Sequence, residues 1–193
     1  MRYRSIILLS AATLALAACG HKSETSTTTE TSVNDTMVAA DNVTDISTPA
    51  IPSQGQTFAN AAAASDAFEI ATSNAALSTS HSAAVKAFAG KMVTAHTGST
   101  AKLKTAAAAA SPAITPDATL TPDQQQTLDA LKAKTGADFD QAYIAAQIDG
   151  HQKTLDALKA YAASGDVPQL KTFATSLVPT VTAHLNMAKG LKP

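Results

Sequence analysis

The chain has little of several residue types on which common scaffolds and binding surfaces depend. Its 193 residues include one cysteine and no tryptophan, and aromatic residues make up 4% of them. A single cysteine cannot form an intramolecular disulfide, which excludes a disulfide-stabilised scaffold. Both arginines, Arg2 and Arg4, lie at the extreme N-terminus. The rest of the chain therefore has no guanidinium group for bidentate recognition of phosphate or carboxylate.

The charge balance excludes a nucleic-acid partner. Without the two N-terminal arginines, the chain has 14 − 2 = 12 lysines against 15 acidic residues, a formal charge of −3. Nucleic-acid-binding proteins are usually basic and carry clustered lysine and arginine side chains. Neither feature is present here.

The N-terminus is typical of a bacterial lipoprotein signal. Two arginines precede the apolar run "SIILLSAATLALAA", which is too short to span a bilayer comfortably. The run leads into "LAAC", which resembles the lipobox, in which cleavage precedes the cysteine and its thiol is lipidated. We expect residues 1–18 to be removed and Cys19 to anchor the chain to a membrane. The alternative is an ordinary secretory signal with a chance cysteine. Gly20 after the cysteine favours the outer membrane, facing the periplasm.

Two regions of different composition follow the signal. Residues 19–56 are rich in Ser, Thr, Asn and Asp and contain few large hydrophobic residues. Such a segment buries too little apolar surface to offset its ordering entropy, so it is predicted to be a disordered tether. Residues 57–193 are rich in alanine, the best helix former, and poor in glycine. This region is predicted to be an all-α domain.

Apolar periodicity and capping signals predict a four-helix bundle with a short extra helix between its second and third long helices. The short helix is expected to begin at Thr121, with a capping-box glutamine at Gln124 and an end near Gly136. Gly165 is expected to end the third long helix and Asp166 to cap the fourth. The long helices are expected to run up-down-up-down, with the turns near residues 80 and 165 at one end, over about 57–78, 82–109, 137–163 and 167–190.

Three histidines lie on the apolar stripes of the second, third and fourth long helices: His96, His151 and His184. A rise of 1.5 Å per residue brings them to within about one helical turn of one another in height. Asn60 and Ser65 on the first helix are expected at the same level, with Glu69 about a turn and a half lower. We treat these three residues as secondary polar candidates near the histidines.

Several interpretations of the histidines remain open. The rings could hydrogen-bond hydroxyl groups on neighbouring turns and so fix the helix register. They could instead bind a zinc or copper ion, or act as a protonation switch. The hydroxyl groups in reach belong to Thr94, Thr97, Thr154, Thr180 and Thr182.

The sequence argues against a di-iron enzyme. A di-iron site in a helical bundle requires about four inward carboxylates and two Glu-x-x-His pairs. Glu69 is the only glutamate in residues 57–193, and Val93, Ile148 and Val181 stand three positions before the three histidines. No glycine-rich phosphate loop and no Gly-x-Ser-x-Gly motif occurs either. We therefore predict no catalytic residues and no enzyme activity.

Three histidine-bearing blocks carry a resemblance to a known family. They read "VKAFAGKMVTAH", "FDQAYIAAQIDGHQKTL" and "LKTFATSLVPTVTAHLNMA". Together they resemble the bacterial exported family labelled domain of unknown function 4142. The resemblance implies a ferritin-like helical fold, frequent lipoprotein signals and no established activity. Members commonly have an acidic residue before the histidine of the second helix, where this chain has Ala95.

The leading functional hypothesis is a lipid-anchored cell-envelope protein that has a binding or structural role and needs no cofactor. The alternative is a metal-binding protein that holds zinc or copper through His96, His151 and His184. The membrane, contacted through the lipid, is the one partner that the sequence indicates. It identifies no protein or small-molecule partner.

Overall fold

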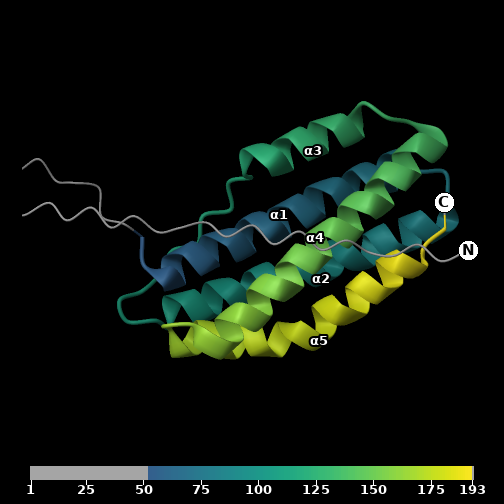
Figure 1. The fold of residues 1–193 in the computed structure, drawn as a ribbon. Coiled ribbons are helices and arrows are strands. Elements are labelled where there is room, and N and C mark those ends of the chain that lie inside the picture. Colours follow the sequence, from purple (N-terminus) through teal and green to yellow (C-terminus); the bar gives the residue numbers. More distant parts are fainter. Residues whose placement is uncertain (1–51, 193) are drawn as a thin grey trace, which may run out of the picture. The chain divides into compact units, whose positions relative to one another are not determined.

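The computed structural model describes residues 52–192, which fold into five α-helices (Figure 1). The all-α class and the four long helices with one short extra helix are confirmed. The signal peptide, Cys19 and most of the predicted tether lie outside the described residues. The helices are α1 (Gln54–Thr79), α2 (Ala83–Ala108), α3 (Pro122–Lys132), α4 (Gly136–Ser164) and α5 (Pro168–Gly190).

The four long helices form a bundle in which α1 packs against α2 and α4, and α5 packs against the same two helices. Hydrogen bonds join Ser65 to Thr154 and Ser73 to Tyr143, so residue numbers rise along α1 as they fall along α4. These two helices are therefore antiparallel. The short α3 packs on α1 and α4 and returns the chain along the bundle (Figure 1). Successive helices alternate in direction when α3 is included.

The extra pass made by α3 changes the position of one turn. The turn near residue 165 lies beside the start of α1, where Phe58 stacks on Tyr161 with ring centroids 3.9 Å apart. The turn near residue 80 lies where α1 ends. The expectation that the two turns share one end of the bundle is therefore wrong, because α3 carries the chain to the opposite end before α4 begins.

The helix ends agree in part with those predicted from the sequence. The capping box of Thr121 and Gln124 is present, and Gly165 is the C-cap of α4. The short helix ends at Lys132 rather than near Gly136, which has φ +58° and is the first residue of α4. Asp166 does not cap α5, because its carboxylate accepts a hydrogen bond from the Tyr161 hydroxyl at 2.8 Å.

The interior contains two apolar clusters. The first lies near the turn at residue 165 and contains Phe58, Leu158 and Phe173. The second contains Phe88 and Phe139 and is nearer the turn at residue 80. Buried polar side chains of α1 and α4 lie between them in the sequence of each helix. Seven aromatic residues are buried in this interior: Phe58, Phe68, Phe88, Phe139, Tyr143, Tyr161 and Phe173.

Candidate metal centre

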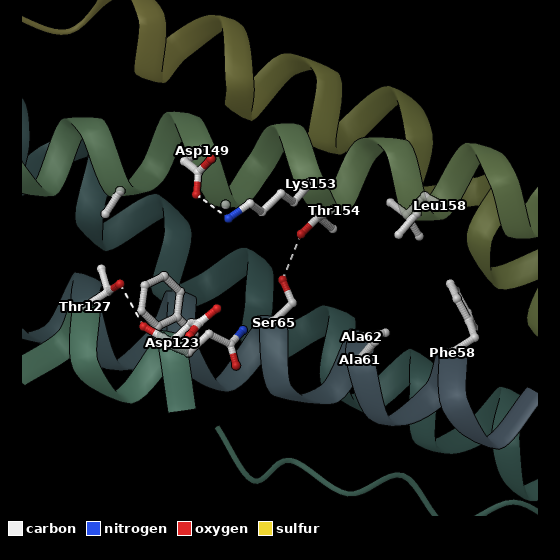
Figure 2. A pocket seen from close by; sticks show the side chains of 15 residues that line it. Phe58, Ala61, Ala62, Ser65, Asp123, Thr127, Asp149, Lys153, Thr154 and Leu158 are labelled. Atoms are coloured by element: carbon white, nitrogen blue, oxygen red, sulfur yellow. Dashed lines mark hydrogen bonds and ion pairs between the residues drawn. The ribbon is translucent and has the colours of Figure 1, made fainter. Parts of the chain in front are cut away.

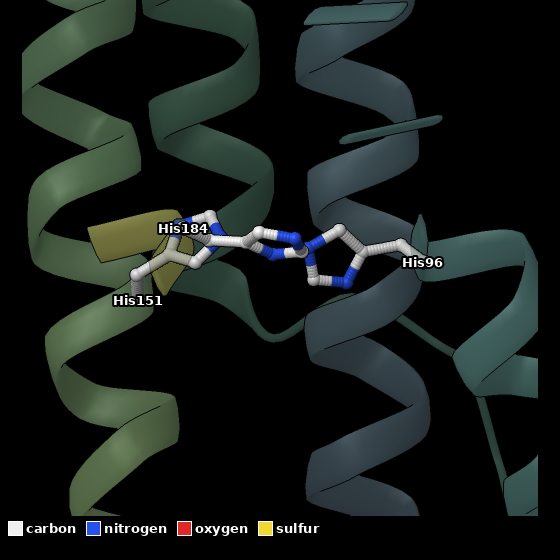
Figure 3. Close-up of side chains that lie close together, drawn as sticks. All are labelled: His96, His151 and His184. Atoms are coloured by element: carbon white, nitrogen blue, oxygen red, sulfur yellow. The ribbon is translucent and has the colours of Figure 1, made fainter. Parts of the chain in front are cut away.

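The structure brings together the three histidines that the sequence singled out, one each from α2, α4 and α5 (Figure 3). The ring centroids of His96, His151 and His184 are 5.5 to 5.8 Å apart. One ring nitrogen from each residue lies within 4.8 Å of the other two. All three residues are buried, with exposed fractions of 5%, 1% and 8%. The arrangement is a near-equilateral triangle of imidazoles in the bundle interior.

The neighbours of His151 determine which of its nitrogens carries hydrogen. Its Nδ1 lies 2.8 Å from the carbonyl oxygen of Gln147, one turn earlier in α4. A carbonyl oxygen only accepts, so Nδ1 must be the donor. In the neutral ring, Nε2 then keeps a free lone pair, and this buried atom has no hydrogen-bond partner in the protein.

His96 has the corresponding arrangement with a carboxylate. Its Nδ1 lies 2.8 Å from Oδ1 of Asp66 on α1, and the Thr100 hydroxyl donates to the other carboxylate oxygen at 3.2 Å. The Nε2 atom of His96 is buried and has no partner in the protein. Asp66 thus supplies an acidic neighbour from another helix, although the position before His96 is Ala95.

Four of the five hydroxyl groups expected around the rings bond elsewhere, and the fifth, on Thr180, is exposed. Thr94, Thr97 and Thr182 donate to carbonyl groups of their own helices, and Thr154 pairs with Ser65. His184 keeps a buried Nδ1 without a partner in the protein. The hydroxyl interpretation therefore leaves one nitrogen of each ring unexplained.

Glu69 of α1 is a buried polar side chain beside His151. Its Oε1 lies 3.7 Å from His151 Nδ1, it is 1% exposed, and neither carboxyl oxygen has a hydrogen-bond partner. Burial raises the pKa of Glu69 to about 7 and lowers the pKa of His151 to about 4. Between these values both groups are neutral, so the contact is not a charged ion pair in the metal-free protein.

The other two secondary candidates are engaged away from the rings. Asn60 accepts hydrogen bonds from the Gln56 side chain and the backbone NH of Asp117. Ser65 pairs with Thr154 at 2.8 Å. Asp66 and Glu69 are the α1 residues that reach the histidines. Ser65 lies one position before Asp66, close to the expected height, but its side chain bonds Thr154. The height of a residue does not show which side of α1 faces the rings.

Gly150 gives the carboxyl group of Glu69 its space. A Cβ atom at this position would lie 2.7 Å from Glu69 Oε1. Glycine inside a helix is less stable than alanine by roughly 0.5–1 kcal/mol. Glycine at position 150 therefore makes α4 less stable next to His151, but it leaves room for the buried carboxyl group of Glu69 between α1 and α4.

We expect Gly150→Ala to lower the free energy of unfolding by roughly 1 kcal/mol, because overpacking outweighs the helix gain. The matched control is Gly98→Ala in α2, where an added Cβ meets nothing within 4 Å. The control should be more stable than the wild type by roughly 0.5–1 kcal/mol. Urea unfolding measures both variants. Equal stabilisation by the two substitutions would contradict the role given to Gly150.

Two cavities lie near the centre. The larger, about 260 Å³, lies between α1, α3 and α4, and its lining includes Ser65, Asp149 and Lys153 (Figure 2). Lys153 pairs with Asp149 at 2.8 Å within the same helix. No histidine lines this cavity. The smaller, about 40 Å³, is lined by His96 and His184.

Comparison with known proteins yields a single family. The family model described as "Domain of unknown function (DUF4142)" matches residues 40–191. No curated protein and no solved structure matches the chain. The match includes all five helices and all three histidines of the triangle.

Proposed function

The chain belongs to the DUF4142 family, and we propose that its helical domain binds one divalent transition-metal ion, zinc or copper, through His96, His151 and His184. One observation carries the proposal. Three buried ring nitrogens from three helices converge within 4.8 Å, and each ring keeps a nitrogen without a protein partner. Imidazole nitrogen is a preferred donor for zinc and copper.

The surroundings of the rings support this assignment. In metal sites, a ligating histidine usually donates its other ring NH to a carboxylate or a backbone carbonyl, which fixes its orientation. His96 meets this condition through Asp66, and His151 meets it through the Gln147 carbonyl. Both rings are held with Nε2 as the available lone pair. A purely structural role for these histidines requires no such arrangement.

The spacing of the rings fits one ion after a small contraction. Zinc–nitrogen bonds of about 2.0–2.1 Å in a tetrahedral site separate the nitrogens by roughly 3.3 Å. The nitrogens here lie within 4.8 Å of one another. Side-chain rotations that move each nitrogen by about 1 Å would bring them to the spacing of a zinc site. A bound ion would then connect α2, α4 and α5. The donor set of three imidazoles without a bridging carboxylate favours one ion over a pair.

Metal titration of the purified chain without a polyhistidine tag tests the proposal. We expect one zinc, cobalt(II) or copper(II) ion per chain, by calorimetry and by metal content after dialysis. Substituting His96, His151 or His184 with leucine should lower affinity at least 100-fold. The control is His81→Leu, because His81 is exposed at the turn between α1 and α2. Binding that survives all three core substitutions but is lost in the control would refute the site.

We further propose that the domain is attached to the cell envelope by lipid on Cys19, at the outer membrane facing the periplasm. The sequence of the signal supports this, and no helix of the described residues is long and apolar enough to cross a membrane. The metal site would then lie in an exported domain.

Cys19→Ser should release the protein from the membrane fraction. The reason is that the thiol is the only attachment point for lipid, and several acyl chains are needed for stable anchoring. Fractionation after a high-salt wash, together with fatty-acid labelling, measures the effect. A mutant that still sediments with membranes would contradict the lipoprotein assignment.

A further inference from the structure

The smaller cavity adjoins the histidine triangle on one side only. Its volume is about 40 Å³, and all four long helices contribute to its lining. His96, His184 and Asp66 line it, whereas His151 does not. The lining also includes Ala95 and Ser99, which are partly exposed, and the exposed Thr180. The cavity therefore connects the triangle with the surface between α2 and α5.

The size of this cavity suits one small ligand. A water molecule takes about 30 Å³ of liquid volume. The cavity of about 40 Å³ has room for water or a small ligand of two or three atoms. Its remaining lining is largely apolar, with Leu158, Phe173, Leu177 and Val181 among the contributors.

Among the described residues, no fourth histidine, cysteine or carboxylate joins the three rings as a ligand group. Asp66 is occupied by His96 Nδ1 and the Thr100 hydroxyl. Glu69 lies 3.7 Å from Nδ1 of His151, the nitrogen of that ring that donates to Gln147 rather than the free Nε2. Structural zinc sites have four protein ligands, whereas three protein ligands leave one position for water or another exogenous ligand.

We infer that a metal ion held by His96, His151 and His184 keeps an exchangeable fourth position that opens into this cavity and takes water or a small monodentate anion. The inference rests on the proposed metal site. It assigns the α2–α5 side as the route of exchange, because His96 and His184 line the cavity and retain slight exposure while His151 is 1% exposed. No covalent or redox step is involved, only replacement of one ligand by another.

Cobalt(II) spectroscopy of the full chain tests this inference with azide as the probe. Cobalt(II) in a four-coordinate site absorbs visible light, and a change of ligand alters the spectrum. We expect azide to produce a saturable spectral change in the wild type. Ala95→Leu, which fills the cavity, should weaken azide binding at least tenfold while cobalt remains bound. Thr180→Leu, at an exposed position of the same lining, provides a second variant that preserves the core.

The control is Ala146→Leu, since Ala146 lines only the larger cavity and is also partly exposed. Azide binding should be unchanged in this variant. If wild-type protein binds cobalt and azide has no effect, the inference is overturned and the proposed metal site stands. If Ala95→Leu, Thr180→Leu and Ala146→Leu all weaken azide binding equally, the assigned route is wrong. If cobalt does not bind at all, the proposed function and this inference fail together.

Discussion

Zinc at about 100 times its dissociation constant is expected to raise the melting temperature of the wild-type protein by roughly 10 °C. The bound ion contributes about 2.7 kcal/mol at that concentration, and a domain of this size shifts by a few degrees per kcal/mol. His151→Leu should abolish the increase, because the remaining two imidazoles bind zinc far more weakly. Thermal unfolding monitored by circular dichroism, with and without zinc, measures the effect.

His151 is the best of the three positions for this experiment. In the metal-free protein, His151→Leu should be nearly neutral, since the lost hydrogen bond involves a backbone carbonyl within α4 and the new side chain is apolar. His96→Leu should instead be destabilising by roughly 1–3 kcal/mol even without zinc, because it removes a partner of the buried Asp66 carboxylate.

The exposed His81 supplies the matched control. His81→Leu should keep the whole zinc-induced increase, since this residue lies at a turn and not in the triangle. A zinc-induced increase that persists in His151→Leu would show that the ion binds elsewhere. No increase in the wild type would favour a purely structural role for the three rings.

Much of the fold could be predicted because its local signals are strong. Alanine-rich segments and short polar turns gave helices close to the observed α2, α4 and α5, and the capping box at Thr121 identified the start of α3. The direction of α4 could not be predicted in the same way. It depends on whether the segment around α3 crosses the bundle, which is decided by tertiary packing on α1 and α4.

His96 and His151 tolerate this error because they lie near the middle of their helices, whereas His184 is the seventeenth of 23 residues in α5. A residue near the middle keeps almost the same height when the helix is inverted. His96 is the fourteenth of 26 residues in α2, and His151 the sixteenth of 29 in α4. Residues nearer a helix end would have been displaced by most of the length of the bundle.

Asp66 was not predicted as a neighbour of the histidines because part of the buried face of α1 is polar. An apolar stripe marks the buried face of α5, with Leu170, Phe173, Val181 and Leu185 among its buried residues. On α1 the buried residues include Asp66, Glu69 and Ser73, which repeat at helical spacing of three and four. That polar repeat within an alanine-rich helix is the signal that would have identified the carboxylates facing the histidines.

The stability of the metal-free protein is expected to rise with pH between about 4.5 and 6.5. Burial lowers the pKa of both His151 and His184 to about 4 from 6.5, so unfolding in this window takes up two protons. Burial raises the pKa of Glu69 to about 7 from 4.5, so unfolding releases one. The net uptake from these groups is 2 − 1 = 1 proton, and each proton contributes a slope of about 1.4 kcal/mol per pH unit.

Glu69→Gln removes the proton released on unfolding and leaves the two that are taken up. The slope of stability against pH should therefore increase by about 1.4 kcal/mol per pH unit, roughly doubling the contribution of these buried groups. Urea unfolding in EDTA at several pH values between 4.5 and 6.5 measures both slopes. Asp149→Asn is the control, because the Asp149 side chain is 66% exposed and should leave the slope unchanged. An unchanged slope in Glu69→Gln would mean that Glu69 is already ionised in the folded protein. Its carboxylate would then place a negative charge beside His151 before any metal binds.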